Sequence, residues 1–240
     1  MTEWVGFDLD DTLHDARRTV DRAHMVCLEH LQQSHDMDSK TLKRAHDEAR
    51  AMAYSSSGLS VRGFSATDSR TKRFQRMLEL VGISDEGVIP SLLDIYARVK
   101  EDSMAVRPGA NELLKELKSR GRSIAVISGG PEETRRMIVD KLGLTPMIDL
   151  LISSGGAGLA KTGGLFGFAL DRMGVRAEDF PYIGDSLDQD ITPALAIGIQ
   201  AVWFRTGYAK PEDRAPDGVP TVSSLPEALG HLIGDDAPSS

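Results

Sequence analysis

The chain has 240 residues, of which 40% are hydrophobic and 27% charged, and its formal net charge is −8 at pH 7. This length suits one large domain or two smaller ones, and the composition is that of an ordinary globular protein. The acidic balance argues against nucleic-acid binding, which needs a basic face, but it allows a small phosphorylated ligand, which needs only local positive charge.

The cysteine content and the apolar runs exclude further classes. The single cysteine, Cys27, cannot form an internal disulfide, and we expect it to be a small core residue because it falls among apolar helical positions. No apolar run approaches the roughly 18 residues of a membrane-spanning helix. No basic segment precedes the first predicted strand, so we expect no signal peptide and a cytoplasmic protein without a membrane partner.

The first predicted element is a short buried strand over residues 4–7, and carboxylates follow it at Asp8, Asp10 and Asp11. Clustered carboxylates repel one another, and burying them costs free energy unless positive charge lies beside them. Mg²⁺, a hard cation that prefers oxygen ligands, would neutralise the cluster. The alternative interpretation is a solvated, aspartate-rich turn.

The next region, residues 15–104, is predicted to be helical throughout. Apolar positions recur at helical spacing in Ala16–Gln33, Lys40–Ala53, Thr71–Leu80 and Ser91–Val99. The serine- and glycine-rich stretch 54–63 is predicted to be a loop between helices. We therefore expect a small all-helical domain inserted after the first strand, with hinges near His14 and near Arg107-Pro108-Gly109.

From residue 105 onward, short apolar runs alternate with amphipathic stretches. The predicted strands are 124–127, 150–152, 182–183 and 201–204, and the predicted helices are 110–120, 132–142, 164–173 and 191–197. Continuous apolar strands separated by helices indicate a parallel sheet covered on both faces. We predict an α/β fold whose doubly wound, Rossmann-like core comprises residues 1–14 and 105–234, followed by a frayed tail at 235–240. Ligands of such sheets bind beyond the carboxyl ends of the strands, where Asp8, Ser128 and Asp185 lie.

Three motifs in this second part join the aspartate cluster. Ser128-Gly129-Gly130 ends a strand, Lys161 follows the glycine-containing stretch 158–160, and Gly184-Asp185 opens a run that includes Asp190. With Asp8-Leu9-Asp10-Asp11-Thr12, and in this order, these motifs resemble the haloacid dehalogenase (HAD) superfamily, particularly phosphatases of the phosphoglycolate phosphatase type. The resemblance covers about residues 3–14 and 105–205, and it implies that residues 15–104 form a helical cap.

The resemblance also implies a Mg²⁺-dependent phosphatase that works through an aspartyl-phosphate. Asp8 would be the nucleophile, since a carboxylate needs no base to attack phosphorus. Asp10 would protonate the leaving oxygen and later deprotonate water, so we expect neighbouring carboxylates to raise its pKa. Asp8, Asp185 and the backbone carbonyl of Asp10 would hold the metal.

The remaining motif residues would bind phosphate or support the site. The Ser128 hydroxyl, the Gly129 N–H and the Lys161 ammonium would hold the phosphate. Asp190 would bind the metal through water or form a salt bridge with Lys161. We expect Thr12 to form a hydrogen bond within its loop. Two positions depart from the superfamily pattern, which are Gly129 in place of an asparagine and Thr162 in place of a frequent proline.

Several alternatives stay open at this point. A phosphomutase uses the same nucleophile and acid, and a non-catalytic phospho-ligand binder would not need Asp10. Two other activities are disfavoured. A dehalogenase in this superfamily lacks the second aspartate, which is present here as Asp10, and a phosphonate hydrolase would need a cap lysine that forms a Schiff base, whereas nothing marks Lys40 or Lys43 as buried. Side chains of the helical region that are candidates to touch a substrate are Tyr54, Arg62, Phe64, Arg70, Arg73 and Arg76. The expected partner is a small phosphorylated metabolite, bound by a monomer or a homodimer.

Overall fold

The computed structural model describes residues 3–56, 66–85 and 87–234. The chain divides into two compact units, one of residues 1–17 with 104–240 and one of residues 18–103. Several sequence predictions lie outside the described residues, namely the tail 235–240, most of the loop 54–63, and the side chains of Tyr54, Arg62 and Phe64. None of the helices in the described ranges combines the length and the apolar composition needed to cross a membrane.

The first unit is built on a sheet of six strands in the order β3-β2-β1-β4-β5-β6, and each neighbouring pair is parallel. The strands are β1 (Trp4–Phe7), β2 (Ser123–Ser128), β3 (Leu150–Ser153), β4 (Pro181–Gly184), β5 (Gln200–Phe204) and β6 (Thr221–Val222). The strand order reverses at β1, as in a doubly wound fold. The predicted α/β class is confirmed, whereas β6 was missed because two residues carry no recognisable pattern.

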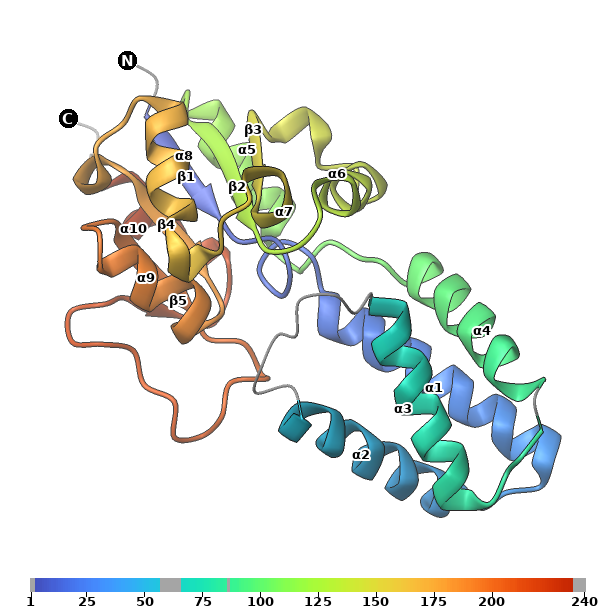
Figure 1. Ribbon diagram of the computed structural model, residues 1–240. Helices are drawn as coiled ribbons and strands as arrows, with labels where there is room; N and C mark the ends of the chain where they lie inside the picture. Colours follow the sequence, from blue (N-terminus) through green and yellow to red (C-terminus); the bar gives the residue numbers. More distant parts are fainter. Residues whose placement is uncertain (1–2, 57–65, 86, 235–240) are drawn as a thin grey trace. The chain divides into compact units, whose positions relative to one another are not determined.

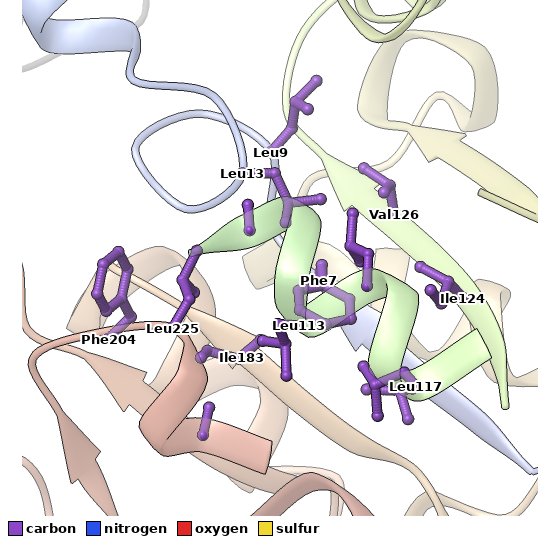
Figure 2. Packing of buried hydrophobic residues seen from close by; sticks show 14 of the residues in the cluster. Phe7, Leu9, Leu13, Leu113, Leu117, Ile124, Val126, Ile183, Phe204 and Leu225 are labelled. Carbon is purple, nitrogen blue, oxygen red and sulfur yellow. The ribbon is translucent and has the colours of Figure 1, made fainter. Parts of the chain in front are cut away.

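Helices cover both faces of this sheet because alternate strand residues point to opposite faces. Phe7, Ile124 and Val126 pack on one face (Figure 2) against α5 (Ala110–Ser119), α6 (Glu132–Lys141) and α10 (Leu229–Ile233). Ala125 and Tyr182 pack on the other face against α8 (Leu165–Met173) and α9 (Thr192–Leu195). Burial on both sides explains the continuous apolar strands of the sequence.

Short helical segments connect the main elements. They are η1 (Thr145–Met147), α7 (Ser154–Ala157), η2 (Lys161–Gly163), η3 (Ala177–Asp179), the π-turn η4 (Leu187–Ile191) and η5 (Pro226–Ala228). The predicted helix 191–197 was therefore placed too late, because η4 begins at Leu187 and α9 ends at Leu195.

The second unit is helical in its described part (Figure 1). Its helices are α1 (Ala16–His35), which starts two residues before the unit, α2 (Ser39–Ser56), α3 (Ala66–Val81) and α4 (Val88–Asp102). They share an apolar core that includes Cys27, Phe74 and Tyr96, each at most 2% exposed. Cys27 is thus a core residue as predicted, and burial raises the pKa of its thiol to about 12.

The two chain segments next to the unit boundary lie side by side in the first unit. The amide of Asp15 donates to the carbonyl of Ala105 (3.0 Å), and the amide of Arg107 donates to the carbonyl of Leu13 (2.8 Å). The Arg107 guanidinium lies 3.1 Å from the Asp15 carboxylate. The chain therefore leaves and re-enters the α/β unit through two connecting segments that form backbone hydrogen bonds with each other.

Candidate active site

A cavity of about 380 Å³ opens in the α/β unit beside the carboxyl ends of β1, β2 and β4. It contains every predicted site residue except Thr12. Its lining residues are Asp8, Asp10, Ser128, Gly129, Arg135, Ser154, Ala160, Lys161, Asp185, Ser186, Gln189 and Asp190. Residues from four distant stretches of the chain meet here because the carboxyl ends of parallel strands share one edge of the sheet.

Lys161 is the positive centre of this cavity. Its ammonium group donates to Oδ1 of Asp8 and to Oδ1 of Asp190, each at 2.5 Å, and to the hydroxyl of Tyr182 at 3.1 Å. The side chain is only 6% exposed. Burial by itself would lower the pKa of Lys161, but the two adjacent carboxylates outweigh burial and raise it. Lys161 is therefore a charged, buried group rather than a surface lysine.

Asp190 is fixed from several sides and is 1% exposed. Its Oδ1 accepts from Lys161 and from the Tyr182 hydroxyl (2.9 Å), and its Oδ2 accepts from the amide of Ser186 (3.0 Å). The π-turn after β4 turns this side chain back toward the strand, a geometry that recurs at functional sites. Of the two roles expected for Asp190, the salt bridge with Lys161 is present in the structure.

Asp8, Asp185 and Asp190 form an acidic group whose carboxylate oxygens include a set lying within 4.8 Å of one another. Burial is the largest effect on both Asp8 and Asp185, and neighbouring carboxylates add to it. The pKa of Asp8 is raised although Lys161 opposes the shift, and the pKa of Asp185 is raised to about 7. Carboxylate oxygens that lie this close together match the ligand chemistry of a hard divalent cation.

Asp10 faces basic partners instead of joining this group. Its Oδ1 lies 2.9 Å from Nδ1 of His14, and its Oδ2 accepts from Nη1 of Arg135. Burial would raise the pKa of Asp10, but the hydrogen bond from His14 and the charge of Arg135 overcome it and lower the pKa. The expectation of a raised pKa was wrong, because the hydrogen bond from His14 and the charge of Arg135 outweigh the effect of burial.

The loop after β2 contributes hydroxyl and amide groups. Ser128 is 1% exposed, and its Oγ lies 3.3 Å from the Gly129 carbonyl. A Cβ at Gly129 would meet nothing within 4 Å, so the loop is open at this position. The amide of Gly130 is already engaged, since it donates to Oγ of Ser154 at 2.7 Å.

The last two residues of the first motif shape the turn. Asp11 has a left-handed backbone (φ 64°), and its carboxylate accepts from the amide of Arg17 at 2.8 Å. Thr12 is fully buried, and its hydroxyl has no hydrogen-bond partner among the described residues. The expected hydrogen bond of Thr12 is therefore absent there, and Thr12 contributes packing instead.

Sequence reasoning missed Arg135, His14 and Tyr182 as parts of this site. Arg135 lies in the first turn of the helix that follows the Ser128 loop, and a charged residue so close to a strand's carboxyl end was the available signal. His14 and Tyr182 carried no such signal, since His14 was taken as a hinge and Tyr182 as an ordinary strand residue.

Comparison with known proteins agrees with this geometry. Residues 2–198 match the sequence profile of a hydrolase family described as haloacid dehalogenase-like hydrolase. This chain belongs to the haloacid dehalogenase-like hydrolase family.

Named relatives of this HAD-family chain are phosphatases. It is 30% identical over 207 residues to a ribulose-1,5-bisphosphate 5-phosphatase of Halopiger xanaduensis, with 85% of each chain covered. It is 29% identical over 247 residues to a phosphoglycolate phosphatase of Rhodospirillum rubrum, covering 99% of this chain and 93% of the relative. The solved HAD-hydrolase YfnB of Bacillus subtilis has the same fold, with a TM-score of 0.71, 20% identity, and coverage of 97% and 99% of the two chains.

Proposed function

We propose that this HAD-family chain is a Mg²⁺-dependent phosphatase that hydrolyses a small phosphorylated metabolite through an aspartyl-phosphate on Asp8. Its class, a phosphoric monoester hydrolase, follows from the family and from the phosphatase names of its relatives. The observation that carries the mechanism is the pairing of Asp8 with buried Lys161 in a cavity that Asp10 and Asp185 also line.

In the first half of the reaction, a carboxylate oxygen of Asp8 attacks the phosphorus. An Asp8–phosphorus bond forms while the bond from phosphorus to the ester oxygen breaks, and Asp10 gives its proton to the departing oxygen. In the second half, water attacks the phosphorus, gives a proton to Asp10 and releases the Asp8 carboxylate with inorganic phosphate. The lowered pKa of Asp10 leaves its carboxylate ionised, which is the state that can accept this proton, although it makes Asp10 a weaker base than a carboxylate with a raised pKa.

Three groups of the cavity would hold the phosphoryl group during both halves. Ser128 would donate its hydroxyl, Gly129 its backbone N–H, and Lys161 its positive charge. Lys161 already contacts Asp8, so it would also hold the nucleophile in place while the phosphate binds. Asp190 supports this arrangement through its salt bridge with Lys161.

Asp8 and Asp185 would hold Mg²⁺, with the backbone carbonyl of Asp10 as a further ligand implied by the family resemblance. The residues fit such an ion, because Asp8, Asp185 and Asp190 place carboxylate oxygens close together and the pKa of Asp185 is raised in the absence of a cation. When bound, the metal supplies positive charge that offsets the repulsion between the Asp8 carboxylate and a phosphate dianion.

The helical unit of residues 18–103 would act as the cap that excludes water and selects the substrate. The relatives named above act on a sugar bisphosphate and on phosphoglycolate, which supports a small phosphorylated metabolite as the substrate class. The cap lysines give no support to phosphonate chemistry, since Lys40 and Lys43 are both exposed and Lys43 pairs with Asp47. A phosphomutase differs in its product, a phosphorylated isomer, and a non-catalytic binder would not need Asp10.

The test is phosphate release from a panel of phosphomonoesters, with Mg²⁺ and with EDTA. Asp8→Asn is compared with Asp188→Asn, a matched variant of an exposed aspartate in the η4 turn. We expect Mg²⁺-dependent release that Asp8→Asn abolishes and Asp188→Asn preserves. Phosphate release that persists in Asp8→Asn would refute the assigned nucleophile, and a phosphorylated isomer in place of free phosphate would identify a mutase.

A further inference from the structure

The Asp10 carboxylate is held at both oxygens, and the two holders differ in origin. His14, four residues later in the same loop, lies 2.9 Å from Oδ1. Arg135, which is 125 positions away on α6, donates to Oδ2 from its Nη1. One of the two contacts with Asp10 therefore comes from a helix that lies outside the first motif.

The approach of Arg135 to Asp10 is built into the backbone of the loop after β2. The guanidinium lies against Gly130, where a Cβ would come 2.7 Å from Nη2 and 3.0 Å from Nε. Gly130 has a φ of 94°, which side-chain-bearing residues rarely adopt. Its missing side chain thus leaves the space that Arg135 occupies.

The Gly130 peptide, which Arg135 contacts, forms hydrogen bonds with the segment that follows β3. The Gly130 amide donates to Oγ of Ser154 (2.7 Å), and its carbonyl accepts from the amide of Gly155 (2.9 Å). The Arg135 side chain is only 14% exposed, and its Nε has no hydrogen-bond partner among the described residues. Among the described residues, its polar contact beyond its own helix is with Asp10, so the arginine is held in place to face that carboxylate.

We propose that Arg135 is a positioning residue for Asp10, which it holds at the edge of the cavity where the leaving oxygen departs. This role rests on the proposed phosphatase function, in which Asp10 exchanges a proton with that oxygen. The Asp10 side chain is 39% exposed. Without the contact from Arg135, water and other side-chain rotamers would therefore compete with the orientation that Asp10 needs for proton transfer. Arg135 acts through Asp10 and not through the phosphoryl group.

Leaving-group dependence separates this role from a structural one. An alkyl phosphate needs a proton on its leaving oxygen, whereas p-nitrophenyl phosphate releases a stable phenolate without one. For Arg135→Gln we expect the single-turnover rate of leaving-group release from the alkyl phosphate to fall about 100-fold, in the range of general acid–base catalysis, with less than about a threefold loss for p-nitrophenyl phosphate. Arg135→Lys should recover part of the loss, and KM should change little.

Two further variants complete the test. Arg136→Gln is the matched control, because Arg136 is the next residue, is 63% exposed and pairs with Glu132. It should retain the wild-type release rate. In an Asp10→Asn background, Arg135→Gln should have no further effect on the alkyl phosphate, since a positioning residue has nothing left to position.

The outcomes distinguish the two proposals. Equal losses in the single-turnover release rate on both substrates, an unchanged release rate, or an additive loss in the double variant would overturn the role of Arg135 while the phosphatase assignment stands. A wild-type protein that releases no phosphate from either substrate would overturn both. Thermal unfolding of each variant identifies a general loss of folding, and the partial recovery in Arg135→Lys then decides between positioning and stability.

Discussion

The Asp190 carboxylate binds the ammonium group of Lys161 with one oxygen and the backbone amide of Ser186 with the other. Lys161 in turn contacts Asp8 at the end of β1. The buried Lys161 ammonium group therefore joins the first strand to the loop after β4 and to the η2 turn. Removing Lys161 would leave two buried carboxylates without their cationic partner.

Lys161→Met tests the cost of that charge. We expect metal-free protein at pH 8 to lose about 3–5 kcal/mol of unfolding free energy, because Asp8 and Asp190 lose their cationic partner. At pH 5 the loss should be smaller, since carboxyl groups with raised pKa values take up protons and become neutral. Urea unfolding of the wild type and the variant at pH 8 and pH 5 measures the loss of unfolding free energy at each pH.

The control for this variant is Lys43→Met, which removes an exposed lysine paired with Asp47. An exposed pair at positions i and i+4 on a helix contributes only about 0.5 kcal/mol. Equal destabilisation by the two substitutions would contradict the central position of Lys161.

The raised pKa of Asp185 predicts that stability depends on pH and on metal. Burial, together with the charges of Asp190 and Asp11, raises this pKa to about 7 without a cation, against about 3.9 in an unfolded chain. The folded state then binds the proton more tightly, so stability falls as pH rises from about 4 through about 7. In EDTA, we expect the thermal midpoint to be higher at pH 5 than at pH 8 by about 3 °C or more.

Magnesium should reverse this trend, because it offsets the charge that proton loss creates. We expect Mg²⁺ to raise the thermal midpoint more at pH 8 than at pH 5. Asp185→Asn should reduce both the pH dependence in EDTA and the stabilisation by Mg²⁺. An Asp185→Asn protein that keeps both effects undiminished would show that another group is responsible.

Gly184→Ala should disturb the site without replacing a charged residue. A Cβ at Gly184 would lie 2.5 Å from Cβ and Cγ of Asp190, so that side chain must shift away from Lys161. We expect a loss of about 2 kcal/mol from overpacking, and a kcat at least about tenfold lower because Lys161 loses its support. Denaturant unfolding and phosphate release measure the two effects.

A second glycine provides the comparison. Gly167 lies in α8, and a Cβ there would meet nothing within 4 Å. Alanine should stabilise this helix by up to about 1 kcal/mol without changing activity. If Gly184→Ala behaved like Gly167→Ala, the close approach of Asp190 to β4 would not matter for the site.

Much of the α/β unit was predictable from local patterns. The apolar runs predicted β1 to β5 because a strand buried on both faces carries no polar alternation. The residues directly after β1, β2 and β4 could be placed at one edge of the sheet because parallel strands end together. The π-turn over Leu187–Ile191 was not predictable, since within it Asp190 contacts Lys161 and Tyr182, which lie outside the turn.

The sequence by itself determined which chemical groups meet, because the order of strands and motifs brings Asp8, Ser128, Lys161 and Asp185 to one cavity. Only the tertiary structure decided the partner of each carboxylate. Asp8 and Asp10 are two residues apart, yet the pKa of the first is raised and that of the second is lowered. The reason is physical, since burial, the hydrogen bond from His14 to Asp10, and the charges of Lys161 and Arg135 set these pKa values, and the last two lie more than a hundred positions from the carboxylates that they contact.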